Sequence, residues 1–171
     1  YRIVDGGYID DLERGARNVN RTVTVGARAT LRLRSSNGWR VDIGGLGQMI
    51  SARDSQYTMA GLGPSSRRSA LAQPFDNSVL LGRVQLTRDW DSGLQLVSNT
   101  SVVGYTPSDR FDASPRGPNV PPSPGVYQPD GDKRLLTHAT RPTRQLPNET
   151  SWDTAVSLLQ DRTQTQRTPV S

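Results

Sequence analysis

Apolar and polar residues alternate with a period of two along much of this chain. In the longest run, residues 19–34, the odd positions are apolar apart from Arg21 and the even positions are polar. After a Ser-Ser-Asn-Gly turn at 35–38, the alternation resumes from Trp39. A period of two is typical of strands with one apolar face, and Asn-Gly between two such runs favours a tight turn. The pattern therefore predicts a β-hairpin.

Two more hairpins follow the same rules. One has an alternating strand over 80–87, a turn at 91–93 and a return strand over 94–106 whose facing the pattern leaves open. The other begins near Arg134, turns at 146–150 and returns through 152–161, and Pro142 is expected to weaken its first strand. With the end of a further strand at residues 1–4, the prediction is an all-β fold: an open antiparallel meander of about six to seven strands.

The connections between these strands alternate strictly between short and long. The short ones are tight turns, whereas the long ones cover residues 5–18, 54–77 and 107–133. Transmembrane β-barrels have this asymmetry, with short periplasmic turns and longer extracellular loops. The meander is therefore predicted to be part of a large transmembrane β-barrel, with long extracellular loops at 54–77 and 107–133.

Aromatic residues give a second indication of the same kind. Trp39, Trp90 and Trp152 each lie within about two residues of a short turn, while Tyr8, Tyr57 and Tyr105 lie at the long-loop end. Trp and Tyr favour the headgroup level of a bilayer. We therefore expect the three Trp residues to form an aromatic girdle.

Composition narrows the chemistry. The chain has 171 residues, a net charge of +5, 33% hydrophobic residues, no Cys and one His. A disulfide scaffold and thiolate zinc sites are excluded, and no metal site or cofactor is predicted. No Ser near His138 lies in a nucleophile elbow, so no enzyme is predicted. The basic residues are spread evenly rather than clustered, which argues against a nucleic-acid partner.

Several segments resemble one protein family. They are DGGYIDD at 5–11, NVN at 18–20, GARATLRLR at 26–34, Trp39 with Gln48, and Asp54-Ser55. GLQLVSNTSVVGY at 93–105 and SWDTAVSLLQDR at 151–162 look like later strands of the same proteins. In this order they resemble the middle of the barrel of the TonB-dependent outer-membrane receptors. Ala139 and Pro142 depart from that pattern, and neither a plug domain nor a TonB box is found.

The resemblance implies a function and a set of site residues. The chain would be part of a Gram-negative outer-membrane receptor that imports a scarce ligand such as a ferric siderophore, cobalamin or a saccharide. It would cover roughly a third of a barrel of about 22 strands. Its partners would be outer-membrane lipid, lipopolysaccharide, the ligand and, through the missing plug, the TonB complex. The residues expected to contact ligand are Tyr57, Arg67, Arg68, Arg110 and Tyr127. The residues expected to face the lumen are Arg28, Arg32, Arg40, Asp42, Gln48 and Arg83.

Two other interpretations remain open. One is that the chain belongs to a soluble, secreted β-rich binding module, in which the apolar faces are buried in a sandwich. Its low hydrophobicity also permits a segment that is mostly disordered by itself.

Overall fold

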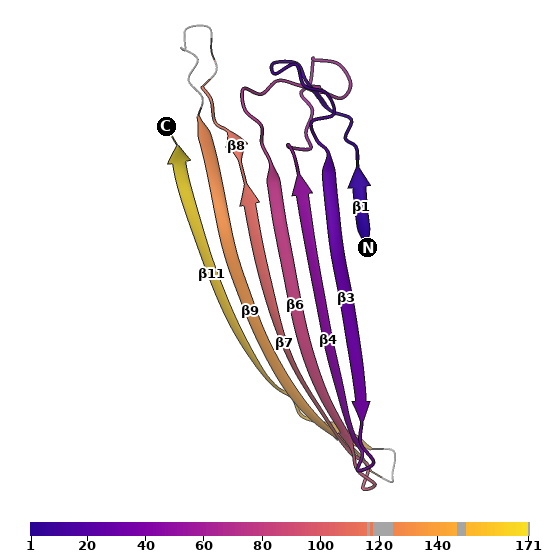
Figure 1. Cartoon of the computed structure of the whole chain (residues 1–171). Helices are drawn as coiled ribbons and strands as arrows, with labels where there is room; N and C mark the ends of the chain where they lie inside the picture. Colours follow the sequence, from indigo (N-terminus) through magenta and orange to yellow (C-terminus); the bar gives the residue numbers. More distant parts are fainter. Residues whose placement is uncertain (116, 118–124, 147–149, 171) are drawn as a thin grey trace.

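The computed structural model describes residues 1–115, 117, 125–146 and 150–170, and in this part the chain forms strands and no helix (Figure 1). The strands are β1 Arg2–Asp5, β2 Asp10–Asp11, β3 Thr22–Arg34, β4 Trp39–Ala52, β5 Ser66–Arg67, β6 Phe75–Asp89, β7 Leu94–Asp109, β8 Phe111–Asp112, β9 Val126–Gln145, β10 Ser151–Asp153 and β11 Val156–Val170.

Six long strands form one continuous antiparallel sheet. Its order is β1-β3-β4-β6-β7-β9, with β10 and β11 both paired to β9 on its other side. The sheet is strongly curved and does not close, so β1 and β11 are its two edges (Figure 1). The predicted open meander of six to seven strands is confirmed.

The tight turns form where the sequence places them. Gly38 has φ +83°, and Ser35 N–H donates to the Trp39 carbonyl at 2.9 Å. Gly93 has φ +78°, and Trp90 N–H donates to the Leu94 carbonyl at 2.9 Å. A positive φ is readily adopted by glycine alone, which explains these two turn residues. The centre of the third turn, residues 147–149, lies outside the described part of the chain.

Several strands extend further than the sequence predicts. β6 begins at Phe75 and β7 continues to Asp109, so both enter segments expected to be loops, and β9 begins at Val126 rather than near Arg134. Cross-strand pairing continues past Pro107, which lies opposite Asn77. The loops at 54–77 and 107–133 are therefore shorter than predicted, because paired neighbours override the local turn signal.

Pro142 interrupts the sheet without changing its register. Asp153 of β10 lies opposite Thr143, and Val156 of β11 lies opposite Thr140, so one register runs through both strands. The break between β10 and β11 falls opposite Pro142, which has no N–H to donate but accepts a hydrogen bond from Thr154 N–H at 3.2 Å. β10 and β11 are thus one strand with a local interruption. The strand that carries Pro142, β9, is itself continuous, so the effect expected in the first strand of the hairpin appears in its partner.

The register divides the sheet into two faces, because directly opposed residues point to the same side. We call the side that carries Val25, Leu31, Ile43, Leu80 and Val102 the apolar face, and the side that carries Arg28, Asp42 and Arg83 the polar face. The register also settles the facing of the strand at 94–106. Val102 pairs with Gly82 on the apolar face and Ser101 with Arg83 on the polar face.

Little of the apolar material is buried. Among the described residues, the buried hydrophobic side chains are Ile9, Val19 and Ala52, and all lie near the long loops. On the apolar face, Leu80 is 70% exposed and Leu158 is 66% exposed. The described sheet therefore has no packed layer against its apolar face, and its small core lies in the loops.

Candidate functional site

The long loops pack together at one end of the sheet, and we call residues 6–21, 53–74 and 110–115 the loop cap. β2 in the first loop pairs in parallel with β5 in the second, with Asp10 opposite Ser66 and Asp11 opposite Arg67. Backbone hydrogen bonds extend the pairing from Asp10 N–H to the Ser65 carbonyl and from Leu12 N–H to the Arg67 carbonyl, each at 2.9 Å. Two loops far apart in sequence thus form one unit.

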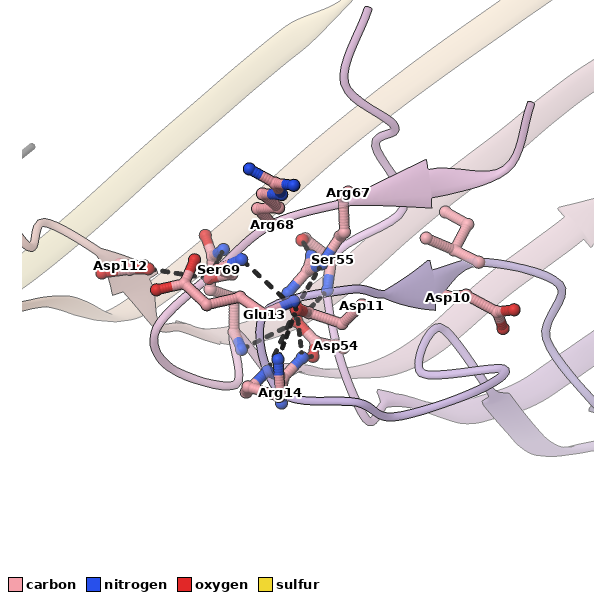
Figure 2. A network of polar contacts seen from close by, with 12 residues as sticks. Asp10, Asp11, Glu13, Arg14, Asp54, Ser55, Arg67, Arg68, Ser69 and Asp112 are labelled. Carbon is pink, nitrogen blue, oxygen red and sulfur yellow. Dashed lines mark hydrogen bonds and ion pairs between the residues drawn. The ribbon is translucent and has the colours of Figure 1, made fainter. Parts of the chain in front are cut away.

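A buried ion network holds this unit together (Figure 2). The Arg67 side chain has no exposed surface, and its Nε donates to Asp11 Oδ2 at 3.1 Å while its Nη2 donates to Asp54 Oδ1 at 2.6 Å. Its third nitrogen hydrogen-bonds to Ser55 Oγ. Arg14 contacts the same two carboxylates, with Nη2 at 2.8 Å from Asp11 Oδ2 and a hydrogen bond to Asp54. Two guanidinium groups therefore face two carboxylates, and their formal charges cancel.

The network changes the acidity of its carboxylates. Burial by itself would raise the pKa of Asp11, but hydrogen bonds from Arg14 and Arg67 outweigh it and lower that pKa below its ordinary value of 3.8. Removing one member of a buried ion network leaves a charge without compensation, which typically costs about 3–5 kcal/mol. The cap is thus rigid at neutral pH and sensitive to loss of either arginine.

A second carboxylate attaches the third loop. Asp112 Oδ2 accepts hydrogen bonds at 2.8 Å from Ser69 Oγ and from Ala70 N–H, and its Oδ1 accepts one at 3.0 Å from Ser114 N–H. Burial alone would raise the pKa of Asp112, but these hydrogen bonds from Ser114, Ser69 and Ala70 lower it well below its ordinary value. All three long loops are therefore joined by carboxylates.

Asn20 closes the first loop onto the second. Its Oδ1 accepts hydrogen bonds from Tyr8 N–H at 2.8 Å and Ile9 N–H at 2.7 Å, and its Nδ2 donates to Gln56 Oε1 at 3.0 Å. Asn20 is 1% exposed, so these bonds replace its contacts with water.

The residues expected to contact ligand lie in different environments. Arg67 is buried and fully used in the ion network, which contradicts the expectation that it faces a ligand. Tyr57 is 46% exposed; Arg67 lies over its ring at 5.2 Å and its hydroxyl accepts from Gln73 Nε2 at 2.8 Å. Arg68 and Arg110 are exposed on the cap. Tyr127 packs near Phe111, with ring centres 6.1 Å apart, at the β8–β9 pairing. These side chains do not line one common cavity.

The residues expected to face the lumen do share one face. The register places Arg28, Arg32, Arg40, Asp42, Gln48 and Arg83 together on the polar face. Asp42 accepts from Arg32 Nε at 2.5 Å and lies 3.8 Å from Arg40 Nε. Tyr1 lies on the same face and donates from its hydroxyl to Gln48 Oε1 at 2.6 Å. The polar face thus carries ion pairs around Asp42, a hydrogen bond between Tyr1 and Gln48, and further arginines.

The apolar face is bounded by a slanted line. On this face, each long strand carries large apolar side chains up to one position, beyond which the residues towards the long loops are small or polar. The last large apolar residues of the six strands are Val23, Met49, Leu80, Val102, Leu136 and Leu158. The row of opposed residues that contains Val23 is polar elsewhere, passing through Ser51, Asp76, Ser108, Asp130 and Gln166. The row that contains Leu158 instead reaches β3 at Leu31, eight residues beyond Val23. The boundary therefore shifts by eight residues from β3 to β11, with no shift between Val102 and Leu136, which are directly opposed.

The slope of this boundary is close to the tilt of strands in transmembrane β-barrels. Eight residues correspond to ~27 Å along the strands, and five strand spacings to ~24 Å across them, which gives roughly 45–50°. Strands of outer-membrane barrels tilt by about 35–45°. A band of constant height in a bilayer would cross the sheet at this slope.

At the short-turn end of the apolar face the three Trp residues lie in two adjacent rows. Trp39 lies opposite Arg88, and Trp152 lies opposite Arg144. The Arg88 guanidinium lies over both neighbouring indoles, 5.0 Å from the Trp39 ring centre and 4.6 Å from that of Trp90. The three Trp residues therefore lie at the same end of the sheet. Tyr105, expected at the other end, is paired with Val79 on the polar face.

Other candidate chemistry is limited. His138 lies on the apolar face, and its ring nitrogens lie 2.9 Å from Thr100 Oγ1 and 3.0 Å from Thr140 Oγ1. A hollow of about 860 Å³ on the apolar face is lined by Gly47, Leu80, Gly82 and Gly104 among others, away from the loop cap. Within the described residues, no group of three or more His, Asp and Glu side chains could hold a metal ion.

Sequence reasoning missed the buried members of the loop cap and Arg88. Asp11 and Asp54 carry no local signal for burial, because their partners lie up to 56 residues away. For Arg88 the sequence does contain a signal of an unusual position. It follows Leu80, Gly82, Val84 and Leu86 on the apolar side of its strand, next to the Trp residues, and is the first charged residue after that run.

Comparison with known proteins identifies no family for this chain. Within the described chain no helix is long and apolar enough to cross a membrane. No family model, no curated protein and no solved structure matches this sequence.

Proposed function

We propose that this chain is one wall of an outer-membrane β-barrel receptor, of the TonB-dependent kind, that captures and imports a scarce ligand. The observation that carries the proposal is the exposed apolar face with its slanted boundary and its row of Trp residues. A water-facing sheet has no reason to expose Leu80 and Leu158 on one side, because contiguous apolar surface of this kind marks contact with lipid or protein.

The two faces would have separate roles. The apolar face meets lipid, and the polar face lines a lumen through Arg28, Arg83 and the ion pairs around Asp42. The free edges at β1 and β11 would pair with further strands, since unpaired backbone groups in hydrocarbon cost several kcal/mol each. Energy for transport would reach the lumen through a plug domain coupled to the TonB complex.

The loop cap would present the ligand-binding side chains. Its ion network fixes the first two loops relative to each other, which lowers the entropy lost when a ligand binds. Exposed Tyr57, Arg68 and Arg110 supply an aromatic ring and two cations, which suits an anionic chelate. Lipopolysaccharide phosphates offer the same cations a second partner.

The alternative is a soluble, secreted β-rich binding module. The specific observation in its favour is the buried polar core of the loop cap, which needs no membrane to form. In such a module another layer would cover the apolar face and exclude it from water.

Refolding separates the two functions. The chain is unfolded in urea and diluted into plain buffer or into phospholipid vesicles, and strand content is followed by circular dichroism. The receptor function predicts aggregation in buffer, and strand structure in vesicles that forms as the free β1 and β11 edges pair between copies of the chain. A monomer in plain buffer with a cooperative thermal transition would establish the soluble module instead.

A matched pair of variants sharpens this test. Replacing Leu31 and Val84 with Ser removes apolar surface from the face proposed to meet lipid, so insertion into vesicles should decrease. Replacing Thr30 and Gln85 with Ser changes the polar face at neighbouring positions and should leave insertion unchanged.

A further inference from the structure

Arg88 is an unusual residue on the apolar face. Its guanidinium lies over the rings of Trp39 and Trp90, and its Nε is buried without a hydrogen-bond partner. Within the described part of the chain it forms no ion pair. A charge on an otherwise apolar face is therefore held by two indoles and not by a carboxylate.

Arg144 repeats the arrangement two strands away. It lies opposite Leu94 on β7 and opposite Trp152 on β10, in the same row as Trp90. It is exposed, and the described chain supplies it with no ion pair.

Two acidic residues of the strands at this end lie on the other face. Asp89 is opposite Gln95 on the polar face and accepts a hydrogen bond from Gln95 Nε2 at 2.7 Å. Asp153 lies opposite Thr143, also on the polar face. In the two rows that carry the Trp residues, the described strands place two Arg and no carboxylate on the apolar face. Among the described residues, neither arginine therefore has a carboxylate partner on this face.

The chemistry of a guanidinium stacked on an indole identifies a partner. Stacking uses the faces of the guanidinium and leaves its in-plane N–H groups available to donate, and these match the paired oxygens of a phosphate. Indole rings themselves favour the level of lipid headgroups. A lipid with a net negative headgroup offers the phosphate without the ammonium that competes for it in a zwitterionic lipid.

We propose that Trp39, Arg88, Trp90, Arg144 and Trp152 form a belt that binds the headgroups of anionic phospholipids in the leaflet next to the short turns. The inference rests on the proposed membrane placement of the chain and adds to it a preference for one class of lipid. Through this contact, Arg88 and Arg144 would also fix how deep the sheet lies in the bilayer and how it is rotated.

The three Trp residues make the test direct, because they are the only Trp residues of the chain and all belong to the belt. The chain is inserted into equimolar vesicles of phosphatidylglycerol and phosphatidylcholine, in which either the first or the second lipid carries brominated acyl chains that quench Trp fluorescence. A basic residue near an anionic surface contributes about a fivefold preference. Quenching should therefore be clearly stronger when the phosphatidylglycerol is brominated.

Variants assign the preference to the two arginines. Arg88→Gln with Arg144→Gln should make the two quenching efficiencies equal, while Arg83→Gln, on the same strand as Arg88 but on the polar face, should leave the difference intact. If loss of Arg88 prevents insertion, Arg144→Gln alone should still reduce the difference, because its side chain is exposed.

The outcomes separate the two proposals. Equal quenching by the two brominated lipids in the unaltered chain would overturn the lipid preference and leave the membrane placement standing. Absence of quenching by either lipid would overturn both.

Discussion

Arg67 donates from Nε to Asp11 Oδ2 at 3.1 Å, and neither side chain has any exposed surface, although 56 residues separate the two in sequence. This contact joins the first long loop to the second. We expect Arg67→Met to leave the two buried carboxylates of Asp11 and Asp54 with Arg14 as their one remaining arginine partner, and to destabilise the loop cap by about 3–5 kcal/mol.

Hydrogen exchange of the cap measures this effect. Peptides that cover 9–14 and 65–73 should exchange about 100-fold faster or more in the variant, whereas the strands should be unaffected. Arg17→Met, at an exposed position of the same loop, is the control and should change little. Unchanged exchange in Arg67→Met would show that the ion network does not hold the loops together.

The cap should open in acid. The pKa values of Asp11 and Asp112 are lowered in the folded cap, so the unfolded cap binds more protons and stability falls as pH decreases below the ordinary value of 3.8. Between pH 5 and 8 these two groups should leave stability constant.

Exchange or pepsin cleavage of the cap between pH 2 and 5 tests this dependence. Asp112→Asn keeps one oxygen acceptor but removes the titrating charge, so the acid dependence at the third loop should flatten. An equally steep dependence in that variant would assign the acid sensitivity to other groups.

Gly26 leaves room for an aromatic ring. A Cβ at position 26 would lie 2.5 Å from the Tyr1 ring, whose hydroxyl donates to Gln48 Oε1. Gly26→Ala should displace the ring, break that hydrogen bond and weaken the β1–β3 pairing by about 1 kcal/mol. Exchange at residues 2–5 is the measurement. Gly44→Ala on the same face, where the nearest atom is 3.7 Å away, should have little effect.

The slanted boundary predicts how much a charged side chain destabilises the sheet at different depths in the bilayer. Val84 lies inside the apolar band and Ser78 near its edge on the same strand and face. In a bilayer, Val84→Arg should cost about 2–4 kcal/mol and Ser78→Arg about 0–1 kcal/mol. Reversible urea unfolding in vesicles gives both values, with Gln85→Arg on the polar face as control. Equal costs at positions 84 and 78 would contradict the assigned band.

Sequence alone was sufficient for the sheet and insufficient for the cap. Alternation fixes which side Leu31 and Arg32 occupy, because one step along a strand reverses the side chain. Strand 94–106 was ambiguous because Ser98 and Thr100 interrupt its apolar side, and only pairing with β6 resolved it. Arg67 was misjudged because its burial depends on carboxylates brought near by the folding of two separate loops.

The most direct test of the membrane placement is a scan of single cysteines, which the absence of native Cys makes straightforward. Spin labels are attached at positions 28 to 33 on β3 in lipid vesicles, and collision rates with oxygen and with a water-soluble nickel chelate are measured. The proposed barrel wall predicts high oxygen accessibility at 29, 31 and 33 and high chelate accessibility at 28, 30 and 32. Chelate accessibility at 29, 31 and 33 equal to that of their neighbours would contradict it.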